Sequence, residues 1–231
     1  KQKVLITGAS RGIGFAMAKR FAEAGYAVYA LWHNQKEQLD GIGALDITPV
    51  HGDVADAASV AAVRDAVGAV DILVNNAAIS RFGLITDLSE AEWDEMMAVN
   101  LKSVFLLSRA FLPDMIRRQS GRIINVSSIF GAVGGSCEVA YSAAKAGVIG
   151  FTKALAKEVG PSGIQVNCIA PGVIDTAMNA RLSAEDLAAL RDETPLGRLG
   201  TPEDVANLAL FLAADKFITG EVLHIGGGYL R

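Results

Sequence analysis

Three residues of this sequence could together deliver a proton to a carbonyl oxygen: Ser128, Tyr141 and Lys145. Tyr141 and Lys145 are four positions apart, so both side chains would lie on one face of a helix. A free phenol has a pKa of about 10, and we expect the neighbouring ammonium to bring the pKa of Tyr141 toward the working range. Ser128 could donate a hydrogen bond to a carbonyl oxygen as negative charge develops there. The alternative is a solvent-facing pair, because this Tyr–Lys spacing is common on amphipathic helices.

A glycine-rich segment near the N-terminus has the features of a dinucleotide-binding turn. It follows a short apolar run at residues 3–7 and precedes a predicted helix at residues 15–24, whose N-terminus would face phosphate groups. Gly8 permits a tight turn, Gly12 lets the backbone approach a pyrophosphate, and Gly14 allows close packing of helix on strand. The spacing Gly-x-x-x-Gly-x-Gly is not the commonest fingerprint, and a purely structural turn is the alternative. The predicted cofactor contacts here are Gly8, Ser10, Arg11, Gly12, Ile13 and Gly14.

The end of the second predicted strand, residues 27–31, favours NADP(H) over NAD(H). An NAD enzyme usually has an Asp or Glu at this point to bind the ribose 2′-hydroxyl, but this chain continues Trp32-His33-Asn34-Gln35-Lys36. Arg11 and Lys36 could instead bring positive charge to a 2′-phosphate, unless both simply lie on the surface. His33 and Asn34 are further candidate contacts for the adenosine, although a solvent-facing histidine fits the sequence equally well.

Together with other motifs, these two sites closely resemble the short-chain dehydrogenase/reductase family over essentially the whole chain. The resemblance implies further cofactor contacts: Asp53 and Val54 at the adenine ring, Asn76, Ala77 and Ala78 of the motif Asn75-Asn76-Ala77-Ala78, Pro171, Gly172, Ile174 and Thr176 at the nicotinamide end, and Tyr141 and Lys145 themselves. Ala78 replaces a family glycine, so we expect its loop to avoid a conformation that only glycine tolerates. The closing segments 218–220 and 226–228 match the family's last strand region.

The resemblance also implies a reaction, the NADPH-dependent reduction of a ketone with Tyr141 as the proton donor. In that mechanism Ser128 orients the carbonyl, while Lys145 lowers the pKa of Tyr141 and holds the nicotinamide ribose. Asn100 matches the family residue that holds a water linking Lys145 to solvent. A non-catalytic NADP-binding sensor or scaffold is an alternative of a different class, but such relatives commonly lose the tyrosine or the lysine.

Two groups within the family are candidates for the substrate. Residues 121–124 and 195–200 are similar to the reductases of 3-oxoacyl-[acyl carrier protein] in fatty-acid synthesis. Those enzymes often dock the acidic carrier through basic residues, where this chain has Gln119 and Ser162. Residues 82–87 and 136–139 instead look like a branch that reduces a 5-aminopentanone group on elongation factor P. Glu138 could offer a carboxylate to that amine, or could be an exposed acid at a helix start.

The composition is that of one globular domain spanning residues 1–231. Hydrophobic residues make up 51% of the chain, but no apolar run reaches the roughly 18 residues of a membrane span, and no leader is recognisable, so we expect a cytoplasmic protein. A net charge of −4 argues against binding nucleic acid. Neither the two cysteines nor the three histidines have metal-ligand spacing, and we expect no metal.

Alternating strand and helix patterns predict an α/β fold, a doubly wound Rossmann-type parallel sheet of about seven strands with helices on both faces. Predicted strands cover residues 3–7, 27–31, 48–51, 70–74, 121–126, 164–169 and 221–225. The main helices cover 15–24, 57–67, about 90–108 with a second segment continuing to 118, and a segment from Tyr141 to about 159. Pro113 is expected to kink the third helix or start a turn. Residues 176–200 are expected to form a mobile lid, or else an ordinary surface excursion. The family resemblance implies a homotetramer that pairs residues 90–118 and 139–160, with a second interface at the last helix and strand.

Overall fold

Seven parallel strands form a single sheet in the order β3-β2-β1-β4-β5-β6-β7 in the computed structural model, which describes residues 1–179 and 182–229. The strands are β1 (Lys3–Thr7), β2 (Ala27–Trp32), β3 (Ile47–His51), β4 (Ile72–Asn75), β5 (Gly121–Val126), β6 (Ile164–Pro171) and β7 (Val222–Ile225). The order reverses between β1 and β4, as in a doubly wound fold. The predicted fold class and strand number are therefore confirmed.

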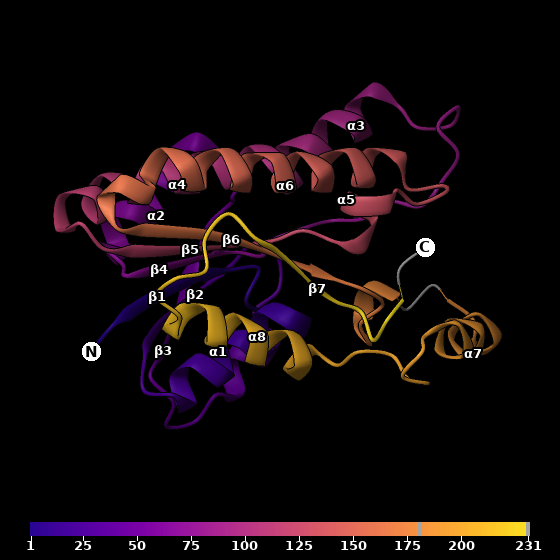
Figure 1. The fold of residues 1–231 in the computed structure, drawn as a ribbon, viewed down its shortest axis with the longest axis horizontal. Coiled ribbons are helices and arrows are strands. Elements are labelled where there is room, and N and C mark those ends of the chain that lie inside the picture. Colours follow the sequence, from indigo (N-terminus) through magenta and orange to yellow (C-terminus); the bar gives the residue numbers. More distant parts are fainter. Residues whose placement is uncertain (180–181, 230–231) are drawn as a thin grey trace.

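Helices cover both faces of the sheet (Figure 1). The longer helices are α1 (Gly12–Glu23), α2 (Ala57–Val67), α3 (Glu90–Met97), α4 (Ser103–Arg118), α6 (Val139–Val159), α7 (Ala184–Glu193) and α8 (Pro202–Ala214). Helices α1 and α8 lie on one face, and α2, α4 and α6 lie on the other. Successive β1 side chains serve both layers, because Val4 and Ile6 pack with α1 and α8 whereas Leu5 packs with α4. This two-sided burial explains why the strands are continuous apolar runs.

The long helix predicted at residues 90–118 contains an irregularity that the sequence did not indicate. It begins at α3 with a capping box between Ser89 and Glu92, and a π-helical turn, η2 (Ala98–Lys102), joins it to α4. The expected break at Pro113 is wrong, because Pro113 lies inside the uninterrupted helix α4. The irregular turn instead contains Asn100, and π-turns inside α-helices are frequent at functional sites.

The shorter elements of the described residues include α5 (Ile129–Val133) and the 3-10 turns η1 (Glu37–Gly41) and η3 (Gly160–Ser162). The predicted lid region contains a 3-10 turn, η4 (Ala177–Asn179), and α7, which stands apart from the two main layers (Figure 1). Ser183 caps α7 as its position predicts, through a capping box with Asp186, while residues 180–181 lie outside the described part. Within residues 1–179 and 182–229, no helix is both long and apolar enough to cross a membrane.

The parallel sheet brings distant segments to one edge. The chain leaves β1 at Gly8, β4 at Asn76, β5 at Ser127 and β6 at Gly172, all at carboxyl ends of strands. Ligands of open α/β sheets bind at this edge, where the strand order reverses. The fold therefore gathers the two predicted sites in one region.

Candidate active site

The glycine turn after β1 is built for close approach of a ligand to the backbone. Gly8 and Gly12 have positive φ values of 62° and 54°, which strain any residue with a side chain. A Cβ on Gly14 would lie 2.1 Å from the carbonyl oxygen of Gly8, so α1 packs directly on the turn. Helix α1 begins at Gly12, and its N-cap residue Arg11 makes no side-chain capping bond. This cradle of glycine backbone and uncapped helix N-terminus fits the pyrophosphate of a dinucleotide.

Residues after β4 hold the glycine turn from the other side. The Asn76 Nδ2 donates to the carbonyl oxygens of Thr7 (2.9 Å) and Gly8 (3.3 Å), and the Ala77 N–H donates to Thr7 Oγ1 at 3.0 Å. Among the described residues, positive φ outside glycine occurs at Gln119 and Cys137, so the loop at Ala78 avoids the glycine-only conformation, as expected. Asn76 and Ala77 therefore shape the cradle as well as border it.

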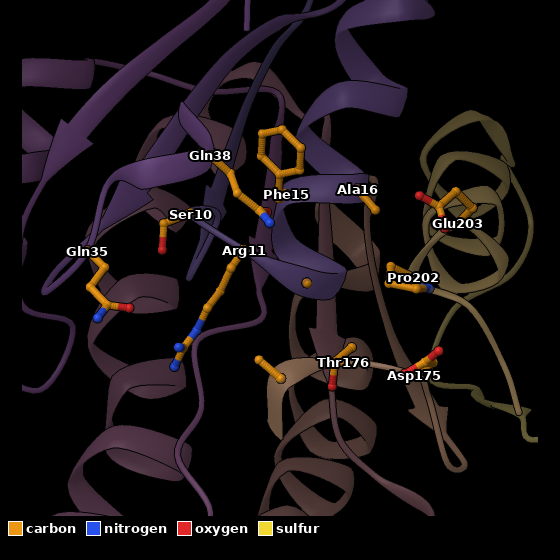
Figure 2. A pocket seen from close by; sticks show the side chains of 12 residues that line it. Ser10, Arg11, Phe15, Ala16, Gln35, Gln38, Asp175, Thr176, Pro202 and Glu203 are labelled. Carbon is orange, nitrogen blue, oxygen red and sulfur yellow. The ribbon is translucent and has the colours of Figure 1, made fainter. Parts of the chain in front are cut away.

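A cavity of about 420 Å³ adjoins the turn on the side of β2 and α8 (Figure 2). Its lining comprises Ser10, Arg11, Gly12, Phe15, Ala16, Gln35, Gln38, Asp175, Thr176, Ala177, Pro202 and Glu203. Figure 2 shows the Arg11 guanidinium extended at the mouth of the cavity, between Gln35 and Thr176. The chain has no acidic residue directly after β2, where an NAD enzyme usually has one, and the carboxylates in the lining come from Asp175 and Glu203.

Several residues predicted to contact the adenosine do not line this cavity. His33 and Asn34 are exposed beside it, and Gln35 and Gln38 take the places in the lining instead. The ammonium of Lys36, a candidate for the 2′-phosphate, forms an ion pair with Asp40 at 2.9 Å. Asp53 and Val54 also lie outside the lining.

The carboxylate of Asp53 is used within its own loop. Its Oδ1 accepts from the Ala55 N–H at 2.8 Å, and its own N–H donates to Ser59 Oγ at 2.8 Å. These bonds shape the turn between β3 and α2, and an adenine contact by Asp53 stays a prediction.

A second cavity, of about 140 Å³, contains the three residues predicted to handle a proton. Ser128, Tyr141 and Lys145 line it together with Glu138. The remaining lining includes Ile13, Asn76, Ala78, Pro171, Gly172, Ile174, Thr176 and Met178, which covers most of the predicted nicotinamide contacts. Because Thr176 and its neighbours line both cavities, the two spaces adjoin and can hold two ends of one ligand.

The position of each proton-handling group follows from local structure. Ser128 ends the extension of β5 and caps α5, with its Oγ accepting from the Phe130 N–H at 3.2 Å. Tyr141 and Lys145 lie on the buried face of α6, and the Lys145 Nζ is 5.7 Å from the centre of the Tyr141 ring. The Lys145 Nζ also donates to the carbonyl oxygen of Val126 at 2.8 Å. The solvent-facing alternative for the Tyr–Lys pair is therefore wrong.

Burial, rather than the Tyr–Lys interaction, dominates the pKa values of this pair. Burial raises the pKa of Tyr141 to about 12, with the Glu138 carboxylate acting in the same direction and a hydrogen bond with Ser128 acting against it. Burial lowers the pKa of Lys145 to about 8. The expectation that Lys145 draws the pKa of Tyr141 down is not met in this structure, since burial raises that pKa and the opposing hydrogen bond comes from Ser128.

Asn100 is buried in the π-turn beneath the loop that follows β4. Its Oδ1 accepts from the Ile79 N–H and its Nδ2 donates to the Ile79 carbonyl oxygen, both at 2.8 Å. The Asn100 side chain therefore fixes the loop that follows β4 through two hydrogen bonds to the Ile79 backbone. That Asn100 also holds a water linking Lys145 to solvent stays a prediction.

Known proteins share this arrangement over nearly their whole length. Residues 8–230 match the family described as enoyl-(acyl carrier protein) reductase. The chain is 44% identical over 235 residues to the 3-oxoacyl-[acyl-carrier-protein] reductase FabG of Vibrio cholerae, which covers 97% of this chain and 95% of that protein. The chain belongs to the short-chain dehydrogenase/reductase family. It is therefore an oxidoreductase, and the family uses a nicotinamide cofactor, which the glycine cradle fits.

Other members of the short-chain dehydrogenase/reductase family show the same relationship. FabG of Escherichia coli K12 is 42% identical over 232 residues, which covers 97% of this chain and 95% of that protein. The crystal structure of a 3-oxoacyl-[acyl-carrier protein] reductase from Brucella melitensis has a TM-score of 0.93 at 38% identity, covering 100% of this chain and 92% of that one. A putative gluconate dehydrogenase from Agrobacterium tumefaciens has a TM-score of 0.93 at 32% identity, covering 100% and 96%. The fold thus accommodates different substrates.

Two site features were missed or misjudged from the sequence. Glu138 is buried, with 7% of its surface exposed, so the interpretation of Glu138 as an exposed acid at a helix start is wrong. Its position three residues before Tyr141 was a usable signal, since the helix start faces the cleft. Gln35 and Gln38 gave no signal, because their place in the cavity depends on the turn after β2.

Proposed function

We propose that this protein reduces the ketone of 3-oxoacyl thioesters to a hydroxyl group, with NADPH as the preferred reductant. The proposal rests on one observation: Ser128, Tyr141 and Lys145 line the same cavity, and that cavity adjoins the glycine cradle. The relatives named as 3-oxoacyl-[acyl-carrier-protein] reductases support the substrate class. A non-catalytic sensor is disfavoured, because such a protein has no use for a buried proton-handling group.

The residues divide the proton chemistry among them. A reduced nicotinamide cofactor, held at its pyrophosphate by the glycine cradle, would supply a hydride to the carbonyl carbon. The Ser128 hydroxyl donates to the carbonyl oxygen and stabilises its developing charge. Tyr141 transfers its phenolic proton to that oxygen, which completes the alcohol. The Lys145 ammonium stabilises the resulting phenolate, which regains its proton from solvent.

The proposed preference for NADPH depends on Arg11. Its guanidinium lies at the mouth of the larger cavity, and it suits a 2′-phosphate because it offers a planar set of donors. Replacing Arg11 with alanine should lower kcat/KM for NADPH about tenfold, roughly the contribution of one charge-assisted hydrogen bond. The value for NADH should stay unchanged. Equal losses for both cofactors would remove Arg11 from this role.

Acetoacetyl thioesters test the substrate proposal directly. NADPH oxidation should be measured with acetoacetyl groups on acyl carrier protein and on coenzyme A, beside simple ketones. We expect both thioesters to be reduced faster than simple ketones. Carrier and coenzyme forms should differ little, since Gln119 and Ser162 lack charge, and Arg118 is engaged with the Val70 carbonyl oxygen at 2.6 Å. Indifference to both thioesters would contradict the assignment.

The buried carboxylate of Glu138 favours a second candidate, reduction of an amine-bearing ketone such as the 5-aminopentanone group on elongation factor P. Glu138 lines the cavity with Tyr141 and opposes formation of the phenolate, a cost that a cationic substrate group would offset. The wild type should then prefer an aminoketone to its uncharged analogue, and Glu138→Gln should abolish the preference. Reduction of thioesters with no such preference would exclude this candidate.

A further inference from the structure

The two consecutive serines at the end of β5 have different tasks. Ser128 has an extended backbone, with φ −160° and ψ 159°, so neighbouring side chains along this segment point to opposite sides. The Ser128 side chain is directed to Tyr141 and α5. The Ser127 Oγ instead donates to the main-chain carbonyl oxygen of Lys145 at 2.7 Å. Both serines line the cavity, but only the Ser128 hydroxyl is directed at Tyr141, whereas the hydroxyl proton of Ser127 is used within the protein.

The end of β5 therefore holds Lys145 both by its side chain and by its main chain. Its Nζ donates to the Val126 carbonyl oxygen at 2.8 Å, and its own carbonyl oxygen accepts from Ser127. Ser127 is itself fixed to the neighbouring strand, since its N–H donates to the Ile169 carbonyl oxygen at 2.8 Å. The lysine is thus tied to two adjacent strands through one buried hydroxyl.

Gly131 provides the space for this contact. A Cβ on Gly131 would lie 2.6 Å from Ser127 Oγ and 2.7 Å from the carbonyl carbon of Lys145. Helix α5 can therefore cover the bond only because residue 131 has no side chain. The carbonyl of Lys145 lies inside α6 and has a second lone pair beyond its helical bond, so the helix does not need Ser127 in order to form.

We propose that Ser127 is a positioning residue. It acts through the main chain of Lys145 and fixes the position and rotation of the α6 turn that presents the ammonium to Tyr141. The inference deepens the proposed ketone reduction and depends on it. A displacement of the ammonium by about 1 Å can cost as much as a hundredfold in rate, so a single hydrogen bond at this point has leverage.

A second buried hydroxyl of α6 supplies a matched control. Thr152 Oγ1 accepts from Asn125 Nδ2 at 2.9 Å and donates to the Val148 carbonyl oxygen at 2.8 Å. It ties the same helix to the same strand, but it lies seven residues beyond Lys145, about two helical turns away. Thr152→Val also leaves the Asn125 amide without its acceptor, so it should destabilise the fold at least as much as Ser127→Ala.

The test compares Ser127→Ala, Ser127→Cys and Thr152→Val by thermal melting and by kcat and KM for the ketone, well below the melting temperatures. Ser127→Ala should lower kcat about tenfold with KM changed less than about twofold, since the residue acts on geometry rather than on binding. Ser127→Cys fills the position with a somewhat larger group that donates only weakly, and it should lose most of the same activity. Thr152→Val should lower the melting temperature and leave kcat unchanged.

Three results would overturn the inference: more than half of kcat retained in Ser127→Ala, an equal loss of kcat in Thr152→Val, or wild-type activity in Ser127→Cys. The third result would show that filling the position, rather than the strong hydrogen bond, is what matters. The wild type must be assayed first with the ketone panel. If the wild type reduces no ketone, the proposed function fails; if only the variants behave otherwise than expected, the role of Ser127 fails alone.

Discussion

Lys145 is the residue whose charge state should limit the reaction. Because burial lowers its pKa to about 8 while that of Tyr141 rises to about 12, raising the pH removes the ammonium well before the phenolic proton. We expect kcat for ketone reduction to be constant below pH 8 and to fall as the pH rises through about 8. Initial rates with saturating NADPH across this range measure the effect. In Lys145→Met the residual activity should lack this inflection, and a wild-type rate that rises above pH 8 would contradict the assignment.

At the scale of single residues, the sequence predicts which side chains lie together but not their pKa values. The four-residue spacing predicts that Tyr141 and Lys145 share a helix face, because that depends only on helical geometry. The direction of the Tyr141 pKa could not be predicted, since it depends on how completely the loops and α5 exclude water from the pair. The burial of Glu138 depends on the same tertiary packing.

The start of α1 is the element on which cofactor binding depends. A side chain at Gly14 would collide with the Gly8 carbonyl, so Gly14→Ala should separate α1 from the turn and move the N–H groups that face the cavity. We expect NADPH affinity to fall at least tenfold, with a lower melting temperature; equilibrium titration of NADPH fluorescence measures it. Gly150→Ala is the control, because nothing lies within 4 Å of its Cβ position and it lies inside helix α6, where alanine is favoured over glycine. Equal NADPH affinity in both variants would contradict the role of this turn.

Elements defined by local patterns were predicted well, and those defined by contacts were not. The apolar runs predict all seven strands, and β1, β5 and α2 have the bounds expected. The π-turn depends on the clamp between Asn100 and the Ile79 backbone, which joins segments 21 residues apart. Such a contact leaves no periodic trace in the sequence.

The whole molecule should be larger than one chain. On the outer surface of α4, Phe105 and Ile116 are 43% and 40% exposed, and their spacing of eleven residues places them on one stripe of the helix. Arg109 lies between them, with its guanidinium 4.9 Å from the Phe105 ring. An apolar stripe of this kind is typical of a protein interface and agrees with the expected pairing of these helices in a homotetramer.

Light scattering coupled to gel filtration should therefore give a mass about four times the 24.2 kDa of one chain. Phe105→Glu should shift the protein toward smaller species, because it buries a charge at the interface. Leu84→Glu is the matched control, because Leu84 is also exposed but lies outside the paired helices and outside the last helix and strand. A monomeric wild type would contradict the expected assembly.

At this scale the sequence predicts the sheet edge that holds the site, since parallel strands must end together, but the shapes of the two cavities depend on side-chain packing.

The most direct test of proton transfer by Tyr141 is the single-turnover reduction of an acetoacetyl thioester by Tyr141→Phe. NADPH binding to the same variant is measured beside it. The substitution removes only the phenolic hydroxyl, so we predict NADPH affinity within about twofold of wild type and a reduction rate lower by about a thousandfold, in the range of general-acid catalysis. Reduction by the variant at the wild-type rate would contradict the claim that Tyr141 supplies the proton.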